Sequence, residues 1–197
     1  METATELDAL NVILSALGEM PVNTLDSGLP VALISLQTLR RQSRAIQTQG
    51  WWFNEDYSYR LVPDVEGRIT VKDALSLRPA GDNAWGSYPR DIVLRGSRVY
   101  DRASQSYIFA DPIHADVIWH LPWDELPFVF RDYVALRAAR QQTDDTRNSQ
   151  VLHEFNRRNE LEAYRALNEA NIDASGENSA SSYEVQLIAG RRFNPWR

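Results

Sequence analysis

Paired carboxylates are the residues of this sequence that could most directly perform chemistry. Two acids held about 5–10 Å apart across a sugar can hydrolyse a glycosidic bond. Close acidic pairs are abundant in the chain, and the candidates are Asp64/Glu66, Asp124/Glu125 and Glu160/Glu162. The second pair also suits the start of a helix, and the third suits a solvated helix face. A carbohydrate (polysaccharide) hydrolase that uses such a pair is therefore the enzymatic alternative to a structural role.

The stretch DPIHADVIWH, residues 111–120, is the best candidate for a metal site. If residues 114–120 form a strand, the side chains of His114, Asp116 and His120 share one face. At about 3.3 Å per residue, however, the two histidines lie roughly 20 Å apart and cannot bind one ion. His114 and Asp116 could do so only with a third ligand from elsewhere in the chain. A polar face opposite the apolar residues of the same strand explains the pattern more simply. We expect no metal and no cofactor.

Other catalytic signatures are missing from the sequence. It contains no G-x-S-x-G, no Walker A motif, no G-x-G-x-x-G and no H-E-x-x-H. Cysteine is absent, which excludes disulfides and thiolate metal sites. The run Trp51-Trp52-Phe53 follows a predicted helix end, where it would anchor the junction in the core or form an exposed patch for a partner.

The basic residues are strongly biased towards arginine. Lys72 is the only lysine among 21 Lys and Arg residues. Arginine is enriched at protein interfaces, where lysine is depleted. A GC-rich genome, which favours arginine codons, would produce the same bias. The arginine clusters could form ion pairs on helix surfaces or contacts between subunits, and they are Arg40/Arg41/Arg44, Arg137/Arg140, Arg157/Arg158 and Arg191/Arg192.

Composition indicates a globular protein. A chain of 197 residues with 43% hydrophobic and 24% charged residues suits one domain, or one domain with an insertion. The net charge of −6 argues against a dedicated DNA or membrane binder. No apolar run approaches 18 residues, and the acidic N-terminal stretch METATELDAL does not resemble a signal peptide.

Two helices are predicted at the start of the chain. The capping-box pattern Thr3-x-x-Glu6, followed by leucines on one helical stripe, predicts a helix over about residues 4–17. Gly18 suits the position after its C-terminus. Pro30 can occupy the first turn of a second helix, which we expect over residues 31–49.

Two more helices are predicted after Asp124, which is a good N-cap. The first should run to about Gln142 with Pro127 in its first turn, and its inward residues should be Phe130, Val134 (or Tyr133) and Ala138. A short connection over 144–148 leads to a long helix over about 149–170, whose apolar side should include Leu152, Phe155 and Leu167.

The middle of the chain has the composition of a small antiparallel sheet of four to six strands. Short β-type runs occur among many Pro, Gly and aromatic residues. The expected strands are Tyr57–Val62, Arg68–Val71, Asp91–Leu94, Val99–Asp101 and Ala115–Leu121. Tyr107-Ile108-Phe109 also resembles the second strand of a hairpin, across a turn from Val99–Asp101.

The predicted fold is α+β and mainly helical. Residues 1–50 and 124–173 should form a helix bundle, and residues 51–123 an antiparallel β region inserted between helices 2 and 3. Residues 174–182 have the composition of a flexible linker. The aromatic and basic segment that follows completes an extended C-terminal arm over 174–197, which we expect to dock on its own body or on a neighbour.

Five stretches, in this order, resemble the tail tubular protein A family, the head-to-tail adaptors of short-tailed bacteriophages (podoviruses). They are ILSALGEMPVNTLDSG (13–28), IQTQGWWFN (46–54), LVPDVEGRI (61–69), RGSRVYDRASQSYIF (95–109) and WDELPFVFRDYVALRAARQ (123–141). Each is weak alone, but five in one order with similar spacing are specific. The similarity covers most of residues 5–170, and the section after about 171 matches poorly.

The resemblance implies a structural protein of the virion, made in the host bacterial cytoplasm and located at the head–tail junction. Such proteins form a ring of about twelve copies with closed rotational symmetry. The implied partners are other copies of the chain, the portal protein above, the nozzle (tail tubular protein B) below, and a tail fibre or spike. Double-stranded DNA would pass through the lumen during packaging or ejection without specific binding. No membrane and no catalytic residue are implied.

The residues that we expect at interfaces lie in three places. The hairpin VYDRASQS would shape the sheet surface that contacts neighbours or the nozzle, and arginines of the second helix and the C-terminal arm would supply further contacts. These residues are Tyr100, Asp101, Arg102, Ser104, Gln105, Ser106, Arg40, Arg44, Arg191, Arg192, Phe193 and Trp196.

Overall fold

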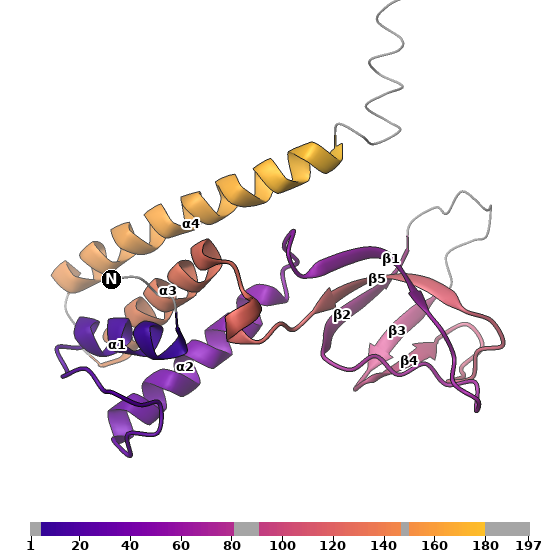
Figure 1. The fold of residues 1–197 in the computed structure, drawn as a ribbon, viewed down its shortest axis with the longest axis horizontal. Coiled ribbons are helices and arrows are strands. Elements are labelled where there is room, and N and C mark those ends of the chain that lie inside the picture. Colours follow the sequence, from indigo (N-terminus) through magenta and orange to yellow (C-terminus); the bar gives the residue numbers. More distant parts are fainter. Residues whose placement is uncertain (1–4, 81–90, 147–149, 180–197) are drawn as a thin grey trace, which may run out of the picture. The chain divides into compact units, whose positions relative to one another are not determined.

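The computed structural model describes residues 5–80, 91–146 and 150–179. Within these ranges the chain forms four α-helices, one short 3-10 helix and five β-strands, with the strands following the second helix (Figure 1). It divides into two compact units, which are Met1–Leu36 with Pro127–Arg197, and Gln37–Leu126. The predicted class, a mainly helical α+β chain with an antiparallel β region between helices 2 and 3, is confirmed.

The first unit is helical. Helix α3 (Phe128–Thr146) contacts both α1 (Glu6–Ala16) and α4 (Gln150–Ser179). Its inward side chains are fully or almost fully buried, and they include the predicted Phe130, Val134 and Ala138. Tyr133, the alternative to Val134, is buried as well. The apolar period of this helix therefore identified its core face correctly.

Helix α1 begins two residues later than its sequence pattern suggested. Thr5 is the N-cap, and its hydroxyl oxygen accepts a hydrogen bond from the Asp8 N–H at 3.1 Å. The Asp8 carboxylate in turn accepts from the Thr5 N–H at 3.0 Å, which completes a capping box. The box predicted at Thr3 and Glu6 is thus wrong, because a second box of the same spacing overlaps it.

Helix α2 (Pro30–Gln47) begins at the predicted proline, and the boundary between the two units falls within it. The start of α3 differs from the prediction. Asp124 lies in a 3-10 helix, η1 (Trp123–Glu125), and not at the N-cap of α3. Helix α3 begins after Pro127, whose carbonyl accepts hydrogen bonds from the first turn. Because proline cannot lie inside a helix, it separates the two elements.

The second unit holds the strands, all paired antiparallel (Figure 1). A three-stranded sheet has the order β1-β5-β2, and β3 pairs with β4. The strands are β1 (Glu55–Leu61), β2 (Ala74–Pro79), β3 (Ile92–Arg95), β4 (Arg98–Asp101) and β5 (Ile113–Trp119). Their core consists of Leu61, Ile69, Val71, Leu77, Ile92, Val99, Phe109, Ile113, Ala115 and Val117.

Three details of the predicted sheet are wrong. Strand β2 was not predicted, because ALSLRP lacks β-branched and aromatic residues. Residues 68–71 form only isolated bridges, Arg68 with Ile108 and Thr70 with Arg98, and not a strand. Residues 107–109 likewise form no strand, although Asp101 and Ser106 pair as an isolated bridge.

Helix α4 is longer than predicted. It continues through Ser179, so residues 174–179 of the predicted linker are helical. Leu167 is buried as expected, but Phe155 is 63% exposed, which corrects its place on the apolar side. The side chain of Leu152 and the C-terminal residues 180–197 lie outside the described part, and with them most of the predicted arm.

Candidate interaction surfaces

Two segments that are far apart in the sequence meet in the β unit. The Phe109 N–H donates to the Gly67 carbonyl at 2.8 Å, and Arg68 bridges to Ile108. The segments carry two of the five motifs named above, the PDVEGR loop and the VYDRASQS hairpin. We call this pair of segments the loop–turn surface, residues 62–68 and 95–109.

The PDVEGR loop is held by its own aspartate. The Asp64 Oδ1 atom accepts hydrogen bonds from the N–H groups of Glu66 and Arg68, at 2.9 and 2.8 Å. The Gly67 N–H also donates to the Asp64 carbonyl at 2.9 Å. This is the aspartate-centred turn that short polar side chains favour. It places Val65 at the tip, where its side chain is 104% exposed relative to the reference residue.

The DRASQS turn is also held by hydrogen bonds to an aspartate side chain. The Asp101 Oδ1 atom accepts from the N–H groups of Ala103 and Ser104, at 2.9 and 3.3 Å. Asp101 and Ser106 exchange two main-chain hydrogen bonds that close the turn, and Gln105 adopts a positive φ of 53°. Asp101, which the sequence suggested as a polar contact for a partner, therefore shapes the turn. Ser104 and Gln105 are exposed at its tip.

Arg102 is also engaged within the chain. Its Nε atom donates to Asp91 Oδ1 at 2.8 Å, and its N–H donates to the Asp91 carbonyl at 2.8 Å. Asp91 immediately precedes β3. The pair fixes the turn against the neighbouring strand.

Arginines and tyrosines stack beside the turn. The Arg95 guanidinium lies 3.6 Å from the centre of the Tyr100 ring, and the Arg98 guanidinium lies 4.8 Å from the centre of the Tyr107 ring. The two rings meet edge to face with their centres 4.8 Å apart. Such cation–π contacts hold an arginine in place while its N–H groups stay available. Of these four residues, only Tyr100 was among the interface residues predicted from the sequence.

The sequence reasoning also missed Val65 and Ile108. The Ile108 side chain is 55% exposed and lies close to Gly67. An isoleucine beside a polar turn and a valine between two acids are weak signals alone. Their exposure follows from turn geometry, which the sequence pattern did not resolve.

The remaining predicted interface residues lie elsewhere. Arg40 and Arg44 are exposed on α2, one helical turn apart. Arg191, Arg192, Phe193 and Trp196 lie outside the described residues. The six hairpin residues thus lie together on the turn of the β unit, and Arg40 and Arg44 lie on α2.

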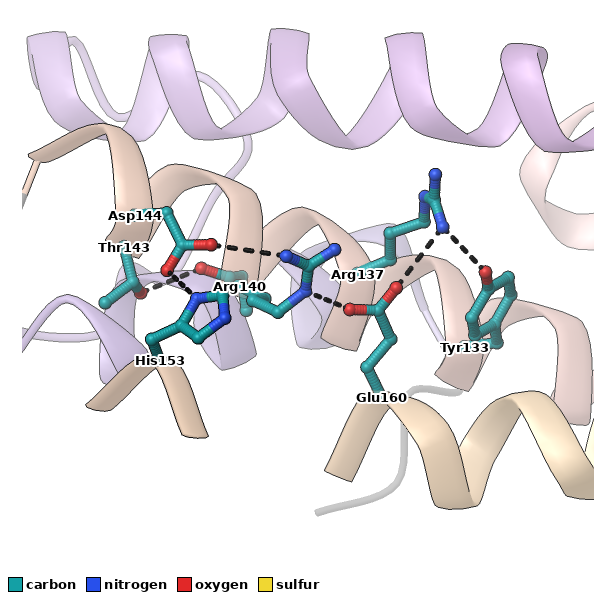
Figure 2. Close-up of polar contacts among 8 residues, drawn as sticks. Tyr133, Arg137, Arg140, Thr143, Asp144, His153 and Glu160 are labelled. Carbon is teal, nitrogen blue, oxygen red and sulfur yellow. Dashed lines mark hydrogen bonds and ion pairs between the residues drawn. The ribbon is translucent and has the colours of Figure 1, made fainter. Parts of the chain in front are cut away.

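A polar network joins α3 to α4 (Figure 2). The Glu160 carboxylate accepts hydrogen bonds from Arg140 and Arg137, and Arg137 also donates to the Tyr133 hydroxyl at 2.9 Å. The Asp144 carboxylate binds Arg140 at 3.2 Å and His153 Nδ1 at 2.9 Å. Glu160 is buried, and a buried carboxylate is stable only when charged or hydrogen-bonding groups pair with it, as the two arginines do here. The network therefore fixes the register of α4 on α3.

Two groups of this network have a shifted pKa. Hydrogen bonding to Glu160, more than the charges of Glu160 and Asp144, raises the pKa of Arg140 above its ordinary value, although burial opposes it. Burial raises the pKa of Tyr133, although Arg137 opposes it. Both shifts favour the forms that the two groups ordinarily have at neutral pH, a charged Arg140 and a neutral Tyr133.

The outer side of α4 carries an open groove of about 400 Å³, lined by Glu154, Phe155, Arg157, Arg158 and Leu161. Phe155 is 63% exposed and Leu161 is 46% exposed. In the described part of the chain, no residue forms an ion pair with Arg157 or Arg158. An apolar floor with arginines beside it is a composition typical of binding surfaces.

Several of the residues considered for chemistry have structural partners. Asp64 holds the PDVEGR loop and Glu160 binds two arginines, while Asp124 is an exposed residue of η1. The Asp116 Oδ1 atom accepts from the N–H of Ser58, a residue at the irregular point of β1. Among the residues that the structure describes, no three His, Cys, Asp or Glu side chains form a group that could hold a metal ion.

None of the helices described is both long and apolar enough to span a membrane.

The polar side chains of the loop–turn surface are largely bonded within the chain, whereas apolar and cationic groups stay exposed. Exposed surfaces of this kind are typical of proteins that bind other proteins.

The comparisons with known proteins agree with this class. A profile of the tail tubular protein family matches residues 7–176. One curated relative is the tail tubular protein A of Klebsiella phage KP34, which is 31% identical over 124 residues. That alignment covers 62% of this chain and 62% of the relative. The chain belongs to the tail tubular protein family. As a member of this family, it has a structural role in a phage tail as part of the virion.

Proposed function

We propose that this protein is the head-to-tail adaptor of a short-tailed phage, in which a ring of about twelve copies joins the portal to the tail nozzle. The match to the tail tubular protein family over residues 7–176 carries the proposal. A closed ring needs two different, complementary patches on every subunit. The chain offers two such patches, the loop–turn surface in the β unit and the α4 groove in the helical unit.

The charge of the chain suits a DNA conduit. DNA that moves through a lumen must not be held by it, and a basic wall would bind the phosphates. A net charge of −6 per chain makes the assembled ring strongly acidic. Double-stranded DNA would therefore pass during packaging and ejection without specific binding.

The expected partners follow from this position at the head–tail junction. They are further copies of the chain, the portal, the nozzle protein (tail tubular protein B) and a tail fibre or spike. The bundle, residues 1–50 and 124–173, and the inserted β region, residues 51–123, would serve different partners. Residues 174–197 would form the docking arm, with Arg191, Arg192, Phe193 and Trp196 as its contacts.

Electron microscopy of purified virions that carry a labelled copy of the chain tests the proposal. We expect density for a closed ring between portal and nozzle that contains the label. A label found away from the head–tail junction, or infectious particles that lack the chain, would refute it. Virions are used because the ring can depend on the portal for its assembly. A purified chain that is monomeric would therefore not contradict the proposal.

Deleting the DRASQS turn, residues 102–105, tests its part in docking. The deletion also removes the contacts of Arg102 with Asp91, so we expect a chain that stays folded by circular dichroism but is less stable. It should impair attachment of the nozzle or fibres. The matched variant, Ser104→Ala with Gln105→Ala, keeps the turn backbone and removes only two exposed side chains. Complete tails from the deletion variant would show that the turn is not a docking surface.

A further inference from the structure

The α4 groove has the chemistry to receive an apolar residue flanked by acids. Phe155 and Leu161 give it an exposed apolar floor. Arg157 and Arg158 lie beside this floor, and Glu154 is the single acid in the lining. The lining therefore carries a net positive charge.

The tip of the PDVEGR loop has the complementary chemistry. Val65 is fully exposed, and it stands between Asp64 and Glu66. The tip therefore presents one apolar side chain with a carboxylate on each side of it in the sequence. The hydrogen bonds to Asp64 fix the loop in this conformation before any partner binds. A preformed loop loses less conformational freedom when it docks.

We propose that the Val65 tip of one copy inserts into the α4 groove of the next copy, with the acids of the loop facing Arg157 and Arg158. The inference rests on the proposed ring and names one of its contacts. The two patches differ, so the contact is head-to-tail and propagates around a ring. The groove is open to solvent, so the side chain at a loop tip can reach its apolar floor.

Two charged residues oppose the contact weakly, namely Arg68 in the loop and Glu154 in the groove. Glu66 pairs with Arg68 in its own loop, but both side chains are about half exposed or more, at 60% and 49%. Exposed pairs of this kind exchange partners at little cost. Glu154 offsets one of the two arginines, which leaves one positive charge in the groove for the loop.

Cysteine cross-linking tests the contact cleanly, because the natural chain has no cysteine. The full-length double variant Val65→Cys with Leu161→Cys would be incorporated into virions and oxidised. A disulfide forms only when the two Cα atoms lie within about 7 Å, so it reports direct contact. On a non-reducing gel we expect a ladder of dimers, trimers and larger species.

Mixed particles give the direction of the contact. When the single variants Val65→Cys and Leu161→Cys are incorporated together, cross-linking should stop at dimers, since each chain then carries one thiol. Either single variant alone should stay monomeric. Dimers from Leu161→Cys alone would show α4 against α4 and overturn the proposal. A monomeric band that migrates faster, from a disulfide within one chain, would overturn it as well.

A matched control separates contact from chance collision. Ile172 lies on the same helix, is 66% exposed and is about three turns from Leu161. The pair Val65→Cys with Ile172→Cys should give no ladder. An equal ladder from both pairs would show non-specific oxidation and refute the contact.

The same particles distinguish this proposal from the proposed function. If electron microscopy shows the ring and the Val65/Leu161 pair gives no cross-link, the adaptor role stands and the contact is wrong. If the chain forms no ring at the head–tail junction, both are wrong. A charge test complements the thiols: Val65→Asp should block ring formation, whereas Val65→Ile should preserve it.

Discussion

Gln47 and Leu121 form a reciprocal pair of hydrogen bonds, although they lie 74 residues apart in the sequence. The Gln47 Nε2 atom donates to the Leu121 carbonyl at 3.2 Å, and the Leu121 N–H donates to Gln47 Oε1 at 2.8 Å. The side-chain amide thus acts as a strand partner for one residue of main chain. Ser43 accepts a further bond from Nε2 at 3.1 Å, so the buried amide is well satisfied.

Asn54 works in the same way beside it. Its amide nitrogen donates to the carbonyls of Gln47 and Trp119, at 3.0 and 2.8 Å, and its amide oxygen accepts from the Trp51 N–H at 2.9 Å. Trp51 is buried, as the core interpretation of the Trp51-Trp52-Phe53 run predicted. Two side-chain amides therefore join the C-terminal end of α2 to the ends of β1 and β5.

Replacing Gln47 with methionine should destabilise the protein. Methionine has a similar length but cannot pair with the main chain of Leu121, so two polar groups lose their partner. The free energy of unfolding should fall by about 2 kcal/mol. Urea denaturation checks this, with Gln37→Met as the control, because Gln37 is an exposed residue of the same helix. Equal stability of the two variants would show that the pair is energetically unimportant.

Replacing Glu160 with glutamine should loosen α4. The substitution leaves Arg137 and Arg140 without their shared carboxylate, and both side chains are at least a quarter exposed, at 39% and 26%. Water compensates in part, so we expect a loss of about 1–2 kcal/mol. Faster tryptic cleavage within α4 would accompany it. Glu162→Gln, an exposed change on the same helix, should have almost no effect.

The N-cap of α1 should make stability depend on acid pH. Hydrogen bonds from Thr5, first from its hydroxyl and then from its N–H, lower the pKa of Asp8 below its ordinary value of 3.8. A lowered pKa in the folded state adds stability that is present above about pH 4 and is lost as the pH falls through the folded value. Thr5→Ala should cost about 1 kcal/mol at neutral pH.

The difference between Thr5→Ala and the natural chain should therefore shrink below about pH 4, as Asp8 becomes protonated in both. Thermal unfolding from pH 7 to pH 3 measures it. Thr24→Ala, a change at an exposed loop threonine, should give a constant and small difference throughout. A constant cost for Thr5→Ala across this range would contradict the role of Asp8.

Local patterns predicted most elements of the fold because their causes are local. The leucine stripe, Pro30 and the alternating residues of β5 act within a few positions of themselves. The predicted N-cap was wrong because Thr3/Glu6 and Thr5/Asp8 have the same spacing. The sequence does not show which of the two pairs caps the helix. Strand β2 depends on pairing with β5 and not on its own residue types.

The interaction surfaces were harder to predict because they depend on contacts between segments that are far apart in the sequence. The motifs that contain Gly67 and Phe109 indicated two turns, but nothing in either motif shows that the turns meet. Phe155 was assigned to the apolar side of α4 because it is apolar, whereas the burial of Glu160 places a charge on that side. The partners of Glu160, which are Arg137 and Arg140, lie on another helix, so the sequence period of α4 alone could not reveal them.

Adding a methyl group at Gly67 should separate the two segments of the loop–turn surface. Gly67 has a positive φ of 76°, and a Cβ there would lie 2.9 Å from Ile108 Cγ2 and 3.3 Å from the Phe109 carbonyl oxygen. Gly96, at φ 63°, has no atom within 4 Å of such a Cβ. Both alanine variants incur the left-handed backbone cost of about 1–2 kcal/mol, and only Gly67→Ala adds a clash. We expect Gly67→Ala to unfold at a lower temperature than Gly96→Ala and to fail in virion assembly. Equal melting temperatures would show that the segments tolerate separation.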